Sequence, residues 1–364
     1  MRSAFWKSDW FLGLAVLLAV VVLNLSSGLI PSLERKAYDM GVQATSRAPS
    51  DRIAVIAIDK PSIDNIGRWP WPRDVHAKMI DALARAKAKV IGYTVFFSEP
   101  ENRKINDTIA RMLELADRSA QASASAEASQ LLELLKGAEQ DFNTDRKLAT
   151  SISGAGNVVL PVLFYGDIPR GRPDKPLPDF LRRNAVRLQG LGDNLPEQTS
   201  AVDISIVEPI GQAAAAVGHL NAFPDVDGAI RTEALAITHF DEYYPSLAAM
   251  LVAKSLNLGP ADIRISAGEA IRIGNLQART DPRARMYTYF YRDRDGRPAF
   301  AEDSFFDVFT GKIPVEKYRD KIVLIGPTAA GLSSLFVTPV NPGMPAVTLS
   351  AHTVSSLLQE HFFV

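Results

Sequence analysis

The chain has 364 residues, and its 40 Lys and Arg against 41 Asp and Glu give a formal net charge of −1. This balance gives no electrostatic case for binding nucleic acid. The absence of cysteine excludes disulfides, thiolate metal sites and a cysteine nucleophile. The five histidines do not follow any metal-binding spacing, so we expect neither a metal nor another cofactor.

A charge-free apolar run from Trp10 to Ile30 dominates the N-terminal region. About 20 such residues in a helix cross the hydrocarbon core of a bilayer, so the run predicts one transmembrane helix. A cleaved signal peptide is the alternative, although the run is long for one. Residues 1–9 then form an N-terminus that is cytoplasmic if the soluble domain, residues 31–364, is exported. Two basic residues flank the run on each side, so the positive-inside rule does not decide its orientation.

Short apolar runs separated by a helical pattern predict the core of the soluble domain. Ile53–Ile58 and Lys89–Phe97 have the composition of buried strands, and Pro72–Ala88 has the apolar stripe of a helix. This order is typical of a parallel crossover unit. Asn157–Phe164 and Ile322–Ile325 predict further strands. We therefore expect an α/β fold with a mixed, largely parallel sheet and helices on both faces.

The segment from Asn102 to Gln140 is polar and helix-forming, and it offers few residues for a core. It predicts two helices that protrude as a hairpin or arm. Its middle part, Ser119–Ser129, is rich in Ala, Ser and Glu, so a disordered tip is an equally good interpretation.

Two later segments carry further predictions. Val217–Phe223 and Ile230–Thr238 flank the sequence Asp225-Val226-Asp227-Gly228, which predicts a hairpin with a tight turn. The two aspartates resemble the start of a calcium loop, but no acidic residue closes it at the required distance. Thr348–Phe362 is the last predicted helix, and the apolar residues after it suggest that the chain is part of a longer protein.

Aromatic, basic and acidic residues gather after the predicted strands, where open α/β sheets place their ligand crevices. Trp faces and Arg side chains suit stacking and anion contacts, and two carboxylates could bind a cation. The structural alternatives are that the tryptophans cap the sheet and that Glu99 pairs with Arg68 or Arg73. The candidate ligand-binding residues are Asp59, Arg68, Trp69, Trp71, Arg73, His76, Thr94, Glu99 and Thr328. No catalytic residue is proposed, because no nucleophile elbow or catalytic triad is found.

Taken together, these stretches resemble the type-2 CHASE domain, the extracytoplasmic sensory module of bacterial transmembrane receptors. The resemblance runs from about Leu33 to Leu358 and rests on strings in a fixed order: LERKAYD, AVIAID, GRWPWPR, HAKMI, VIGYTVFFSEP, GHLNAFPDVDGAIR, PSLAAML, DKIVLIGPTAAGL and VTPV. Many members carry acidic residues where this chain has Thr94, Ser334 and the segment 346–348. An acidic or cation-binding role is therefore in doubt here.

The resemblance implies a location and a role. The soluble domain would lie in the periplasm, anchored in the bacterial inner membrane, and it would not itself be an enzyme. The cytoplasmic output would be a serine/threonine kinase or an adenylate cyclase outside this chain, with the kinase branch favoured. We expect a homodimer that senses an unknown small-molecule or protein stimulus. The alternative is a periplasmic dimerisation or protein-interaction module without a small ligand, which would use the arm as its contact surface.

Overall fold

The computed structural model divides the chain into two compact units, Met1–Arg47 and Ala48–Val364. The residues it describes are 9–26, 29–122, 126–168, 171, 176–190, 196–294 and 296–363.

The first unit consists of two helices, α1 (Asp9–Ser26) and α2 (Leu29–Ala44). The apolar side chains of α1 are exposed along its length, including Trp10, Leu12 and Leu17. Among the described residues, no helix is long and apolar enough to cross a membrane, so the predicted transmembrane helix is not supported. The predicted span is divided between α1 and α2, and residues 27 and 28 lie outside the described residues.

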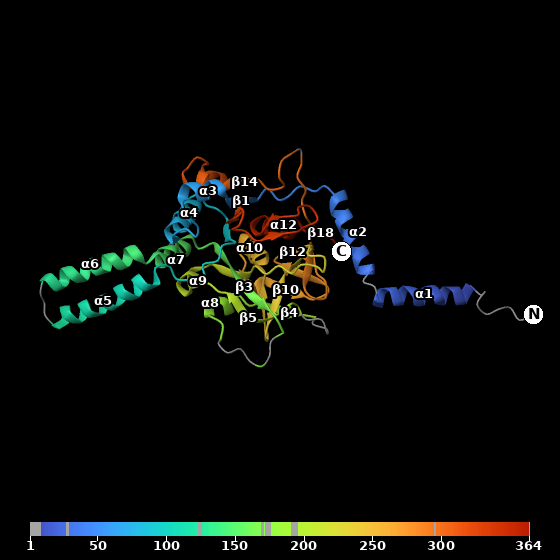
Figure 1. The fold of residues 1–364 in the computed structure, drawn as a ribbon, viewed down its shortest axis with the longest axis horizontal. Coiled ribbons are helices and arrows are strands. Elements are labelled where there is room, and N and C mark those ends of the chain that lie inside the picture. Colours follow the sequence, from blue (N-terminus) through green and yellow to red (C-terminus); the bar gives the residue numbers. More distant parts are fainter. Residues whose placement is uncertain are drawn as a thin grey trace, which may run out of the picture. The chain divides into compact units, whose positions relative to one another are not determined.

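A nine-stranded sheet forms the centre of the second unit (Figure 1). Six of its eight strand pairings are parallel, and only β3–β5 and β8–β9 are antiparallel. The predicted mixed, largely parallel sheet is therefore confirmed. In spatial order the strands are β14 (Glu302–Ser304), β1 (Ile53–Ile58), β15 (Ile322–Pro327), β2 (Val90–Tyr93), β3 (Val158–Gly166), β5 (Gln198–Ile204), β8 (Ala236–His239) and β9 (Glu242–Pro245), with β6 (Ala216–His219) paired to β3.

The crossover from β1 to β2 leaves room for a third strand. β15, from the C-terminal part of the chain, lies between them and pairs in parallel with both, with Ile56 opposite Ile325 and Ile325 opposite Tyr93. The carboxyl ends of β1, β15 and β2 therefore meet at one edge of the sheet.

Helices cover both faces of this sheet, as predicted. Along β1, Ile56 and Ile58 point into one core, whereas Ile53 and Val55 point into the other, which is the period-two alternation of a strand buried on both sides. The first core is covered by α4 (Arg73–Arg85), α7 (Thr144–Ala155) and α9 (Glu208–Ala213). The second is covered by α10 (Leu247–Ser255) and α12 (Ala346–Gln359).

Smaller elements complete the unit. Three short α-helices and two 3-10 helices are α3 (Lys60–Ile66), α8 (Asp179–Arg182), α11 (Phe305–Phe309), η2 (Pro260–Asp262) and η3 (Val315–Tyr318). The minor sheets contain β4 (Arg187–Gln189), β10 (Ile263–Ser266), β11 (Ala270–Ile273) and β12 (Leu276–Arg279); β7 (Thr232–Ala234), β13 (Arg285–Thr288) and β18 (Phe362–Phe363); and β16 (Leu335–Phe336) and β17 (Met344–Pro345).

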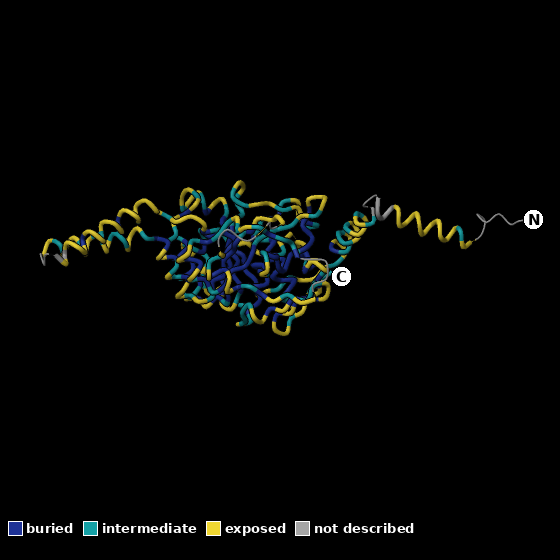
Figure 2. Tube along the Cα trace, turned by 90° about the horizontal axis from the view of Figure 1, so that it is seen from below, coloured by how far each residue is buried: buried dark blue, intermediate teal, exposed yellow. Residues whose placement is uncertain are grey.

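The predicted arm is a pair of helices, α5 (Arg103–Ala122) and α6 (Ala126–Phe142), which pack against each other as a protruding hairpin (Figures 1 and 2). We call these two helices the arm. The hairpin interpretation is confirmed for the helices. The alternative is a disordered tip at Ser119–Ser129. Residues 119–122 and 126–129 belong to the two helices, and residues 123–125 lie outside the described residues.

The predicted hairpin around residues 225–228 is wrong, although its turn is present. β6 pairs with β3, whereas β7 pairs with β13 and β8 with β9. The buried side chain of Arg231 donates to both Asp225 and Asp227 at 2.8–2.9 Å, and this ion-pair cluster holds the turn in place of a strand ladder. Because the arginine occupies both carboxylates, the calcium interpretation has no support.

A close approach of α10 to the sheet gives a stability prediction. A Cβ added at Gly218 would lie 2.7 Å from the Cα of Leu247, which is backbone and cannot move aside cheaply. Gly218→Ala should therefore cost about 1–3 kcal/mol in the free energy of unfolding. Gly154→Ala, in the last turn of α7 with open space around it, is the matched control. It should be neutral or stabilise by up to about 1 kcal/mol. Equal effects in urea titrations would contradict this packing.

Candidate functional site

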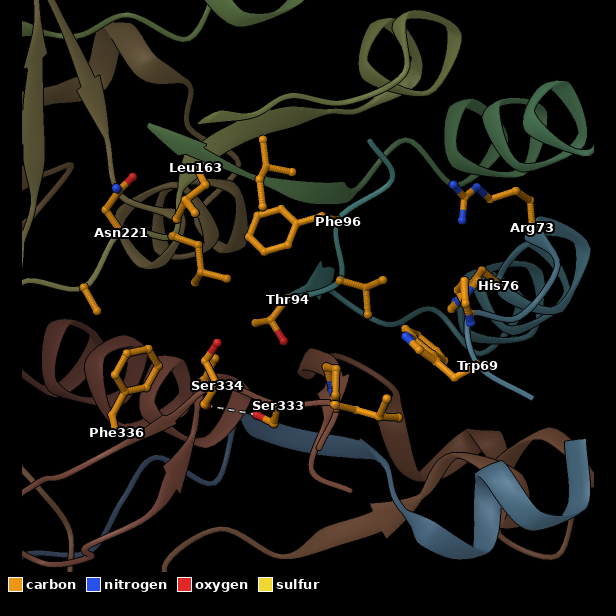
Figure 3. A pocket seen from close by; sticks show the side chains of 18 residues that line it. Trp69, Arg73, His76, Thr94, Phe96, Leu163, Asn221, Ser333, Ser334 and Phe336 are labelled. Atoms are coloured by element: carbon orange, nitrogen blue, oxygen red, sulfur yellow. Dashed lines mark hydrogen bonds between the residues drawn. The ribbon is translucent and has the colours of Figure 1, made fainter. Parts of the chain in front are cut away.

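A cavity of about 620 Å³ opens where β2 and β15 end (Figure 3). In the figure, Trp69, Arg73 and His76 lie on one side of Thr94, and Asn221 and Phe336 lie on the other. Four segments and three further residues line it: residues within 69–76, 94–96, 220–222 and 327–336, together with Leu163, Ile204 and Ala346. Ligand sites in open α/β sheets form at such carboxyl-terminal edges.

Thr94 is the first residue after β2, and its hydroxyl is left without a partner. Its backbone N–H donates to the carbonyl of Ile325 at 2.9 Å, which extends the pairing with β15 and fixes its position. The residue is only 5% exposed, and Oγ1 has no hydrogen-bond partner among the described residues. Gly326 makes room for it, because a Cβ there would lie 1.9 Å from Oγ1. Since an unpaired buried hydroxyl is unfavourable, a bound ligand that satisfies it would gain affinity.

His76 forms an aromatic wall together with Trp69, with ring centroids 6.0 Å apart and the rings nearly perpendicular. Burial, and secondarily the charge of Arg73, lowers the pKa of His76 to about 3. The imidazole is therefore neutral at any physiological pH. Its Nδ1 lacks a hydrogen-bond partner within the described part of the chain, so this wall also offers an unused polar atom.

Arg73 lines the cavity, but its charge is already neutralised. Its side chain donates to Asp145 at 3.2 Å and to the carbonyl of Glu99 at 2.9 Å, and its guanidinium lies 4.9 Å from the ring centroid of Phe97. Both members of the ion pair are buried, with side chains 11% and 7% exposed. Burial raises the pKa of Asp145, while the N–H of Glu101 and the Arg73 charge oppose that rise. The predicted anion contact at Arg73 is thus replaced by an internal ion pair.

Glu233 lies beside a small extension of the cavity, of about 20 Å³, which shares Leu220, Asn221 and Phe336 with it. Burial raises the pKa of Glu233 to about 8, against a weaker opposing effect of the Ser246 hydroxyl. The carboxyl group therefore carries a proton at neutral pH. Glu233 lines this small pocket and not the main cavity, where neutral His76 and the paired Arg73 leave no unbalanced charge.

Of the nine candidate residues, Trp69, Arg73, His76 and Thr94 line the cavity. Trp71 does not: it is 2% exposed, its Nε1 donates to the carbonyl of Gly67 at 2.9 Å, and it packs against Phe305. Trp71 is part of the core on this face of the sheet, as the structural interpretation expects. Trp69 is partly buried against the same core and also lines the cavity.

The remaining four candidates are not part of the cavity lining. Asp59 caps α3 and accepts from the backbone N–H of Ser62 at 2.9 Å. Arg68 and Glu99 are exposed, and Thr328 donates its N–H to the carbonyl of Ile58. Asp59 is used as a helix cap, and no acidic or histidine cluster suited to a metal exists among the described residues. Neither Asp59 nor Glu99 lines the cavity, so the proposed carboxylate pair is not part of it.

Residues of the opposite wall were missed from the sequence, and Asn221 is the most informative of them. Its amide donates to the carbonyl of Phe164 and accepts from the N–H of the same residue, which pins it to β3. It comes two residues after β6, so the rule that placed candidates after β1 and β2 would have found it there.

The buried ion pair gives one stability prediction. Arg73→Ala leaves Asp145 buried without its partner, so unfolding should become easier by about 3–5 kcal/mol. Combining Arg73→Met with Asp145→Leu should recover part of that loss, because no unpaired charge remains. The exposed pair of Lys78 with Asp74 provides the control, and Lys78→Ala should cost less than about 1 kcal/mol. If chemical denaturation gave Arg73→Ala the same small effect, the ion pair would be unimportant.

The raised pKa of Glu233 predicts a pH dependence. The folded chain keeps a proton that the unfolded chain releases above the model value of 4.5, so this group's contribution to stability is lost as the pH rises towards about 8. Glu233→Gln cannot lose that proton, so its melting temperature should fall less than that of the wild type between pH 5 and pH 8. Glu269→Gln, at an exposed position, should follow the wild type. If the melting temperatures of all three proteins changed with pH in parallel, Glu233 would be ionised in the folded protein.

Comparison with known proteins adds an identification to this geometry. No curated protein matches the chain, and no solved structure does. The family model of the CHASE2 domain matches residues 15–364, nearly the whole chain. CHASE2 domains are extracytoplasmic sensory domains and are not catalytic. The resemblance to the type-2 CHASE domain is thereby confirmed, and the chain belongs to the CHASE2 domain family.

Proposed function

We propose that this chain is the extracytoplasmic sensor of a bacterial transmembrane receptor and that it binds an uncharged small molecule in the cavity beside Thr94. The observation that carries the proposal is a cavity of about 620 Å³ containing a buried hydroxyl without a partner. Sites for small molecules typically have volumes of roughly 300–1,000 Å³ and a few converging polar groups.

The charge state of the lining selects the ligand class. A charged ligand would need a counter-charge, because moving a charge out of water is costly unless it is paired. Among the lining residues, Arg73 is paired with Asp145 and His76 is neutral, and neither offers a counter-charge to a ligand. An uncharged molecule avoids this cost.

The side chains that line the cavity also indicate the shape of the ligand. Trp69, Phe96 and Phe336 supply aromatic surface. Thr94 Oγ1 and His76 Nδ1 supply polar atoms without a partner among the described residues, and His76 lies to one side of Thr94 (Figure 3). Aromatic rings of this kind pack against flat apolar groups. The preferred ligand therefore has an apolar body with hydrogen-bonding groups that reach Thr94 and His76.

The location is part of the proposal. CHASE2 domains are extracytoplasmic, and the exposed apolar side chains of α1 suit contact with lipid. We place the soluble unit in the periplasm and attach it to the inner membrane through the run from Trp10 to Ile30. The output, a serine/threonine kinase or an adenylate cyclase, would belong to the parent protein. Ligand binding would shift that output by favouring one of two arrangements of the sensor.

The ligand class can be tested with fragments of matched size that are neutral, anionic or cationic. Neutral fragments should raise the melting temperature of the full chain more often than either charged set. Ala222→Trp fills the cavity from its wall and should abolish those shifts, whereas Ala261→Trp, at an exposed position, should retain them. Equal hits among charged fragments, or hits that survive Ala222→Trp, would contradict the proposed site.

The membrane attachment can be tested by fractionation and reporter fusion. The full chain should pellet with membranes and resist alkaline carbonate, and a reporter fused after Val364 should be active only in the periplasm. Replacing Leu14 and Leu17 by Arg should move the chain to the soluble fraction, because charges are costly in hydrocarbon. Release of the unmodified chain by carbonate, or cytoplasmic reporter activity, would argue against the assignment.

A further inference from the structure

Four large apolar side chains are exposed on the distal half of the arm. Met112 and Leu115 on α5 are 48% and 66% exposed, and Leu131 and Leu134 on α6 are 51% and 66% exposed. At 1.5 Å per residue, all four lie roughly 8–15 Å from the helix ends at the tip. Helices on a soluble surface normally expose polar residues on the side away from their partner.

These side chains do not belong to the contact between α5 and α6. That contact uses Ile109 and Ala116, which are buried, and the partly buried Leu132 and Leu135. Successive residues of a helix differ by roughly 100° about its axis. On each helix, the two exposed side chains therefore lie about 40–125° from the middle of the buried pair, and the sense of this rotation about the axis is the same in both helices. Because the two helices run in opposite directions, the same rotation places both pairs on one face of the arm. We call Met112, Leu115, Leu131 and Leu134 the apolar face.

We propose that the apolar face binds the same face of a second copy of this chain, with both arms pointing the same way, to form a four-helix bundle. Contiguous apolar surface of this kind marks interaction sites. Homodimers with two-fold symmetry use one self-complementary patch. The proposal goes beyond the sensor function and does not depend on the cavity or its ligand.

Charge supports a second copy in this orientation. By the same helical positions, the outer edge of α5 beside the apolar face carries Lys104, Arg111 and Arg118, and the corresponding edge of α6 carries Glu127 and Asp141. A two-fold axis along the arm sets α5 of one copy against α6 of the other, so the basic edge meets the acidic edge. Arms pointing in opposite directions would set α5 against α5 and basic residues against basic ones. Arg118 also pairs with Glu114 within its own helix, which leaves its charge at the same edge.

The same symmetry aligns the apolar side chains in layers. Leu115 and Leu134 lie roughly 10 and 12 Å from the tip, so each packs against the other across the interface. Leu131 and Met112 lie nearer the axis and meet their own copies. Layers of this type form the core of four-helix bundles. Four side chains per copy make a small interface, and attachment of both copies to one membrane would raise their effective concentration.

Disulfide trapping tests the interface, because the chain contains no cysteine of its own. Full-length chains carrying Leu115→Cys with one tag and Leu134→Cys with another are co-expressed, and isolated membranes are oxidised. We expect a disulfide dimer containing both tags, at several times the yield of the matched control pair. In that control, Lys136→Cys replaces Leu134→Cys, since Lys136 lies on the opposite face of α6. Adding Leu131→Glu to both chains should abolish the mixed dimer.

Three results would overturn the proposal. The first is a mixed-tag yield no higher than that of the Lys136→Cys control. The second is a stronger dimer from Leu115→Cys alone, which would indicate arms pointing in opposite directions. The third is a disulfide to a protein of another mass, which would identify the apolar face as a site for a different partner.

Discussion

The ion pair between Arg73 and Asp145 holds together the parts of the chain that meet at the cavity. Arg73 opens α4, and Asp145 lies in the first turn of α7. The backbone N–H of Glu101 donates to Asp145 at 2.8 Å, and the carboxylate of Glu101 accepts from the N–H of Arg73 and the hydroxyl of Thr144. Both carboxylate oxygens of Asp145 thus accept a hydrogen bond, which is the condition under which a buried ion pair is tolerated.

The cluster has two consequences for function. It neutralises the charge of Arg73 at the cavity, and the proposal of an uncharged ligand depends on this pairing. It also connects both ends of the arm, at its base, to Arg73 in the cavity wall, because Glu101 precedes α5 and Thr144 follows α6. A ligand that shifts Arg73 would therefore act directly on the base of the arm. This contact offers a physical route between the ligand site and the proposed dimer face, provided that the two arrangements of the arm differ in ligand affinity.

Local sequence patterns predicted the core well. β1, α4 and β3 lie where the apolar runs and the helical stripe placed them, because both faces of the sheet are buried and the pattern has one interpretation. The pairing of strands was harder. β15 enters between β1 and β2 from more than 200 residues away in sequence, and no local pattern encodes that neighbour. The failed hairpin has a similar cause, since Arg231 satisfies the aspartates of the turn through a contact that turn propensities ignore.

The candidate site was predicted in part, for a related reason. The rule that ligands bind after parallel strands found Trp69, Arg73 and His76, and Thr94 was singled out through the family resemblance. The rule could not distinguish side chains that face the cavity from those that cap an element. Asp59 is a helix cap and Trp71 is core, and both uses depend on hydrogen bonds that only the fold reveals. The wall around Asn221 and Phe336 comes from distant segments. The arm was recognised as two helices. Its exposed apolar face could not be predicted, because that requires knowing which side of each helix packs against the other helix.

The account rests on the Thr94 hydroxyl being kept unpaired for a ligand, and one substitution measures this directly. Thr94→Val removes the hydroxyl while keeping the shape of the side chain. If the hydroxyl is unpaired in the free protein, the variant should unfold at the same or a higher temperature than the wild type, because a buried unsatisfied group costs about 1–3 kcal/mol. A neutral fragment that binds the wild type should then bind the variant several-fold more weakly. A variant that is clearly less stable, with unchanged fragment affinity, would show that the hydroxyl serves the fold, and the central claim would be wrong.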